Sequence, residues 1–130
     1  MNVNQFSNSS PSPIDQGEIK IKAFIAEPYP DGRRVKIKLL LSSFQRGPNA
    51  VINISDQDDL QLASINIVSI FSQENEITIH IPGNHKKPGI YTAAVDVFNI
   101  EEEEIEQEGE QRLDFKQSLI DSASTSFSIQ

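Results

Sequence analysis

The chain has 130 residues, no cysteine and a formal net charge of -8 at pH 7. This acidic balance argues against duplex nucleic acid and anionic membranes as partners, because both require a basic face on the protein. The lack of cysteine excludes disulfides and a thiol nucleophile.

The first 17 residues are mostly Asn, Ser, Pro and Gln, and they predict a disordered tail ahead of a single folded domain over residues 18–130. The start lacks the basic and apolar regions of a signal peptide, and no apolar run is long enough to span a membrane. The sequence therefore predicts a cytoplasmic protein.

Short segments with apolar residues at every second position follow the tail, as expected for half-buried β-strands. They cover residues 19–25, 35–41, 51–54, 76–81, 90–98 and 127–129. One or two further strands lie between residues 60 and 71, where a change of phase favours a bulge or a strand that changes sheets. Residues 110–120 alone have helical spacing, with a thin apolar stripe. The pattern predicts an all-β antiparallel sandwich or barrel.

The most specific pattern runs from Pro88 to Phe98, where a Pro-Gly turn leads into Tyr91 and then into alternating Ala93, Val95 and Val97. Together with the strand before it, this stretch resembles strand E, the E–F corner and strand F of immunoglobulin-like and fibronectin type III-like domains. The resemblance implies an antiparallel two-sheet β-sandwich of about seven strands, with Tyr91 as a structural residue whose hydroxyl bonds to the corner. Because the chain has no Cys pair and no Trp, isoleucine and leucine must fill the core.

In such a domain, residues 99–126 make a very long connection between strands F and G, and long connections are often functional or disordered. A run of acidic residues makes this segment the first interaction candidate: Glu101, Glu102, Glu103, Glu104 and Glu106. One interpretation is a docking surface for a basic partner, or a loose divalent-cation site. The other is a solvated hairpin tip that turns at Glu108-Gly109.

Asp56, Asp58 and Asp59 lie in one predicted turn and are the candidate metal ligands, because calcium prefers several carboxylate oxygens at such spacing. The EF-hand pattern is not completed, since its glycine and glutamate positions hold Gln61 and Ile67. A polar turn without a metal is the alternative interpretation.

No serine nucleophile elbow and no glycine-rich phosphate loop is present, so the sequence predicts neither an enzyme nor a cofactor. We expect a non-catalytic protein-binding or scaffold module, which binds another protein or associates with itself through a sheet edge. The alternatives are a calcium-dependent module that uses the aspartates, and a carbohydrate-binding module, for which Tyr29 is the available tyrosine.

Overall fold

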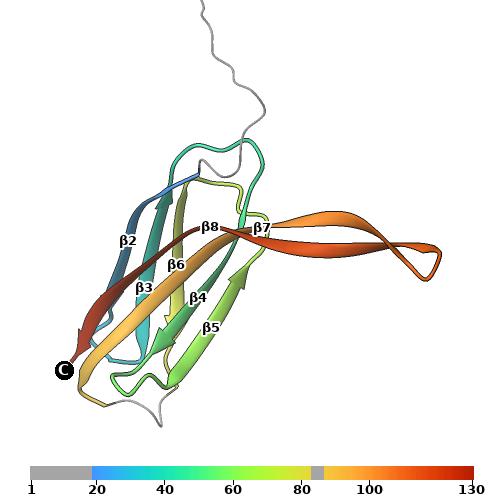
Figure 1. Cartoon of the computed structure of the whole chain (residues 1–130). Coiled ribbons are helices and arrows are strands. Elements are labelled where there is room, and N and C mark those ends of the chain that lie inside the picture. The colour runs from blue at the N-terminus through green and yellow to red at the C-terminus, as the bar shows by residue number, and fades with distance from the viewer. Residues whose placement is uncertain (1–18, 83–86) are drawn as a thin grey trace, which may run out of the picture.

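The computed structural model describes residues 19–82 and 87–130, apart from the side chains of Glu103 and Gln107 (Figure 1). These residues form seven strands and no helix, which confirms the predicted all-β antiparallel sandwich. The predicted N-terminal tail, residues 1–17, lies outside the described residues. The strands are β2 (Ile21–Pro28), β3 (Arg34–Leu41), β4 (Asn49–Ser55), β5 (Gln61–Ile67), β6 (Glu74–His80), β7 (Gly89–Gln107) and β8 (Glu110–Ile129).

Two antiparallel sheets enclose one apolar core. The three-stranded sheet has the order β2-β3-β6, and the four-stranded sheet has the order β5-β4-β7-β8. Every second residue of the central strands points inward, as the period of a pleated strand requires. The buried hydrophobic residues on these strands are Val35, Ile37, Leu39 and Leu41 of β3, Ala50, Ile52 and Ile54 of β4, and Tyr91, Ala93, Val95 and Val97 of β7.

Two bulges change which side chains reach this core. In β2 the register shifts between Ile21 and Ala23, so Phe24 packs against the core while Ile25 is exposed. In β5 the register shifts at Leu62, and this bulge accounts for the change of phase in the sequence between residues 60 and 71. That segment forms a single strand.

Strands β7 and β8 continue through most of residues 99–126, so the long connection is itself a β-hairpin. A helix over residues 110–120 is therefore wrong. The hairpin turns at Glu108 and Gly109, whose φ angles of 56° and 77° match the two positive angles of a type I′ turn. Within the described part of the chain, no helix is long and apolar enough to cross a membrane.

The hairpin leaves the sandwich at a third bulge, where Val97 pairs with Asp121 and Phe98 pairs with Leu119. At this point a carboxylate oxygen of Asp121 accepts a hydrogen bond from the backbone N–H of Ile21, at 2.9 Å. This bond ties the first residue of β2 to β8 across the gap between the two sheets. Beyond it, the two strands extend from the body as an isolated ribbon (Figure 1).

Candidate interaction surface

The projecting part of the β7–β8 hairpin carries large apolar side chains in contact with solvent. The register places even-numbered residues of β7 on the same face as odd-numbered residues of β8. The apolar face, as we call it, comprises Ile100 (48% exposed), Leu113 (62%), Phe115 (64%) and Leu119 (66%). Single exposed apolar residues are ordinary, but a contiguous group of them marks an interaction site.

Three of the predicted interaction residues lie on this same face, along β7. Glu102 is directly across from Phe115, and Glu104 is directly across from Leu113. Glu106 follows toward the tip. Between Ile100 and the tip, the apolar face therefore has apolar residues on β8 and acidic residues on β7, and a partner that covers it meets both kinds of side chain.

The opposite face of the ribbon is charged, with both signs represented. Glu101 is across from Lys116, and Glu103 is across from Asp114, although the Glu103 side chain is not among those described. Arg112 belongs to the same face. The five predicted glutamates are thus divided between two faces and do not form one cluster.

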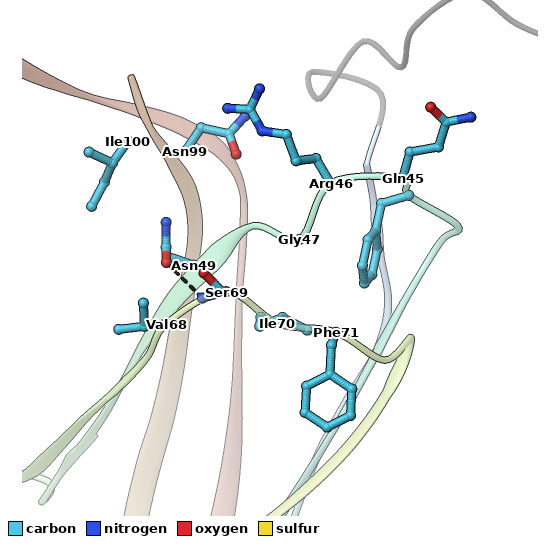
Figure 2. Close-up of a pocket in the computed structure, with 11 residues that line it drawn as sticks. Gln45, Arg46, Gly47, Asn49, Val68, Ser69, Ile70, Phe71, Asn99 and Ile100 are labelled. Atoms are coloured by element: carbon cyan, nitrogen blue, oxygen red, sulfur yellow. Dashed lines mark hydrogen bonds between the residues drawn. The ribbon is translucent and has the colours of Figure 1, made fainter. Parts of the chain in front are cut away.

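An open cleft of about 630 Å³ lies where the hairpin leaves the body (Figure 2). Its walls are the connection between β3 and β4, the segment that follows β5, and the part of β7 around Ile100. A side-chain oxygen of Asn49 accepts a hydrogen bond from the N–H of Ser69 there, at 2.9 Å. Val68 and Phe71, which are 76% and 95% exposed, also line the cleft, so apolar surface continues from the hairpin onto the body.

Tyr91 is buried at the beginning of β7. Its hydroxyl donates a hydrogen bond to the carbonyl oxygen of Lys87, at 2.6 Å, and accepts one from the N–H of the same residue, at 3.1 Å. Its ring stacks on Phe127 with 5.7 Å between the ring centroids. These contacts attach the chain before β7 to the core, and they give Tyr91 a structural rather than a ligand-binding environment.

Replacing Tyr91 with phenylalanine should lower the free energy of unfolding by about 1 kcal/mol, the usual net value of a hydrogen bond. The fold should remain, because the ring and its contact with Phe127 are kept. Thermal unfolding followed by circular dichroism measures this. Tyr29→Phe is the control, since the contact of the Tyr29 hydroxyl with Thr78 is exposed and 3.4 Å long. Equal melting of Tyr91→Phe and the parent would contradict the corner role.

The three candidate metal ligands lie in a turn that one of them stabilises. A carboxylate oxygen of Asp56 accepts hydrogen bonds from the N–H groups of Asp58 and Leu60, both at 2.9 Å. Asp59 has a positive φ of 64° in the same turn. Among residues 19–82 and 87–130, no three carboxylate, histidine or cysteine side chains are placed to share a metal ion. The arrangement is that of a turn closed by an aspartate side chain.

Both tyrosines are engaged within the protein. The guanidinium carbon of Arg34 lies 4.2 Å from the centre of the Tyr29 ring, over its face. Tyr91 is buried. The phenylalanines Phe71 and Phe115 offer more open aromatic surface for a sugar to stack on.

The apolar residues of β8 on the apolar face are not predicted from the sequence as part of an interaction surface. Leu113 and Phe115 alternate with Arg112, Asp114 and Lys116, which is the period of a strand. That signal was available in the sequence, but it extends over few residues and competes with a helical spacing in the same segment.

Comparison with models of known protein families gives no match to this chain, and comparison with curated proteins gives none either.

Proposed function

We propose that this protein is a non-catalytic protein-binding module with an immunoglobulin-like β-sandwich, and that the β7–β8 hairpin is its binding element. The observation that carries the proposal is the exposed apolar face of the hairpin, bordered by glutamates. The lack of cysteine supports the further proposal that the module works in a reducing compartment such as the cytoplasm.

The strand order supports the immunoglobulin-like assignment. In immunoglobulin domains, strands A, B and E share one sheet, strands C, F and G share the other, and variable domains add C′ to the second sheet. When β2 to β8 are named A, B, C, C′, E, F and G in chain order, both sheets agree with this scheme. The hydrogen bond from Tyr91 to Lys87, two residues before strand F begins, agrees with it as well.

The projecting part of the hairpin adds little to the stability of the fold, and this supports a role in binding. A two-stranded ribbon is only marginally stable in water unless one face packs against something. Here the apolar face remains in solvent, so its side chains contribute little to the stability of the sandwich. Covering them would release about 25 cal/mol for each Å² of apolar area removed from water.

The acidic residues of the apolar face indicate the chemistry of the partner. Glu102 and Glu104 lie directly across from the apolar residues of β8, so a bound segment must offer lysine or arginine beside apolar side chains. A strand that carries both basic and apolar residues on one face, that is at every second position, satisfies both requirements. We therefore propose a basic, apolar protein segment as the ligand, with charge guiding the encounter and apolar contact providing much of the affinity.

A synthetic peptide that has lysine, valine, lysine and phenylalanine at successive second positions, with serine between them, places all four on one face of a strand and is a suitable probe. Fluorescence anisotropy of the labelled peptide measures its binding. The double variant Leu113→Ser/Phe115→Ser should weaken binding at least about tenfold, since it removes both central apolar anchors. Ile90→Ser is the matched control, because Ile90 is an exposed apolar residue of β7 outside the projecting part of the hairpin, and its replacement should leave binding unchanged.

Added salt separates apolar contact from charge attraction, because salt screens exposed charges but not apolar contacts. The proposal predicts that the difference between the parent and Leu113→Ser/Phe115→Ser persists in high salt. Equal binding by the two proteins at low salt would contradict it, since the peptide would then be held by the glutamates alone.

A further inference from the structure

Strand β8 of the hairpin has an open edge. On one side β8 pairs with β7 along its whole length, and in the described residues no other strand pairs with it. The backbone N–H and C=O groups of an edge strand are a template for another strand. The other edge of the ribbon, along β7, carries glutamates that would repel a second acidic strand.

The charged face along the β8 edge has an alternating pattern. Glu110, Arg112, Asp114 and Lys116 occupy every second position, so the signs read minus, plus, minus, plus. Within its own hairpin Arg112 pairs with Ile105, which offers no opposite charge. A strand that pairs with the open edge of β8 could place a carboxylate beside Arg112.

Two copies of β8 can pair antiparallel about a twofold axis perpendicular to the sheet. A twofold axis perpendicular to the sheet leaves each side chain on the same face, and residues directly across from each other must share a face. The axis must therefore pass beside one residue that lies directly across from the same residue of the second copy. An axis through Leu113 sets Glu110 against Lys116 and Arg112 against Asp114, and symmetry produces each pair twice.

Neighbouring registers are less favourable. An axis through Arg112 or Asp114 sets that residue against its own charge, and like charges directly across are destabilising. An axis through Phe115 keeps only the pairing of Asp114 with Lys116, and it sets Arg112 against Ser118. An axis through Gln111 keeps only the pairing of Glu110 with Arg112, and it sets Asp114 against Glu108. The charge pattern therefore selects the register centred on Leu113.

We propose that a second copy of this chain binds along the β8 edge, antiparallel, with Leu113 opposite Leu113 of the partner subunit. The four strands of the two hairpins then form one sheet. The two copies of Leu113 meet at its centre on one face, with Phe115 of each copy diagonally next to Leu113 of the partner subunit, and the glutamates of both β7 strands form its outer edges. Each sandwich lies beyond the tip of the other hairpin, since the paired segment runs only from Glu110 to Lys116.

Two variants of the full-length chain test this arrangement by sedimentation equilibrium. Arg112→Glu/Lys116→Glu makes the edge entirely negative, and Glu110→Lys/Asp114→Lys makes it entirely positive. The parent should form a dimer, and each variant alone should dissociate at least about tenfold more readily, because every cross-strand pair becomes repulsive. An equimolar mixture of the two variants should restore the dimer, which also shows that both are folded.

The exchanged variant Arg112→Asp/Asp114→Arg tests the register. It keeps opposite charges across an axis through Leu113, so the dimer should remain. With an axis through Phe115, the new arginine would oppose Lys116 and the dimer would weaken, which would overturn the proposed register. A parent that stays monomeric at millimolar concentration would overturn the dimer itself, as would a mixture that fails to associate.

This inference goes beyond the proposed function, because it concerns the edge of the hairpin and not its apolar face. The two fail separately. A monomeric parent that still binds the basic peptide refutes the dimer alone, and a dimer that ignores the peptide refutes the peptide-binding face alone.

Discussion

Replacing Ile52 with alanine should lower the free energy of unfolding by about 3 kcal/mol, because loss of a fully buried isoleucine removes apolar contacts and leaves a cavity. Leu113→Ala removes apolar atoms too, but from a side chain that is 62% exposed, and should change stability by less than about 0.5 kcal/mol. Urea unfolding at low protein concentration measures both values and keeps self-association out of the comparison.

The difference in unfolding free energy between these two variants shows whether the side chains of the hairpin are buried like those of the core. If Leu113→Ala costs as much as Ile52→Ala, then the apolar face is covered in the folded monomer, and the basis of the proposed function is lost. If Leu113→Ala costs little, the apolar residues of the hairpin must be explained by something other than folding.

Gly47→Ala should destabilise the protein by about 3 kcal/mol and lower the melting temperature by on the order of 10 °C. A Cβ atom at Gly47 would lie 1.8 Å from the carbonyl oxygen of Ile70. That oxygen belongs to the backbone of a buried residue, and the N–H of the same residue donates a 2.8 Å hydrogen bond to the carbonyl oxygen of Pro48. In the Gly47→Ala variant, the connection between β3 and β4 therefore has to move away from the segment after β5.

Gly109→Ala is the matched control for this prediction. The space around Gly109 is open, so its only obstacle is a φ of 77°, a conformation that costs alanine about 1 kcal/mol. Scanning calorimetry of both variants gives the comparison. A Gly47→Ala protein that melts no lower than Gly109→Ala would contradict the close approach at Ile70.

The sequence predicts the strands of the body well, because each of them buries one face. Val35, Ile37 and Leu39 alternate with Lys36 and Lys38, and a one-residue slip would put the lysines into the core. The three bulges could not be predicted to the residue, since a bulge is a local change that the partner strand decides. That is why Ile25 is exposed where simple alternation would bury it.

The candidate surface could be predicted only in part. The adjacent glutamates at positions 101–104 indicate that this segment is exposed. A hairpin that turns at Glu108-Gly109 is one of the two structures that the sequence predicts for it. The pairing of Glu102 with Phe115 and of Glu104 with Leu113 depends on the register of two strands, which a single sequence does not specify outside a core. The cleft beside Ile100 joins three segments distant in the chain, so no local pattern indicates it.

NMR chemical-shift mapping most directly tests whether a basic, apolar segment binds the apolar face of the β7–β8 hairpin. The lysine-containing peptide would be titrated into the labelled full-length chain, with a peptide that has glutamate in place of lysine as the control. The largest shifts should occur at Ile100, Glu102, Leu113 and Phe115, and only with the basic peptide. Shifts concentrated on the strands of the sandwich, or none at high peptide concentration, would contradict binding at the apolar face.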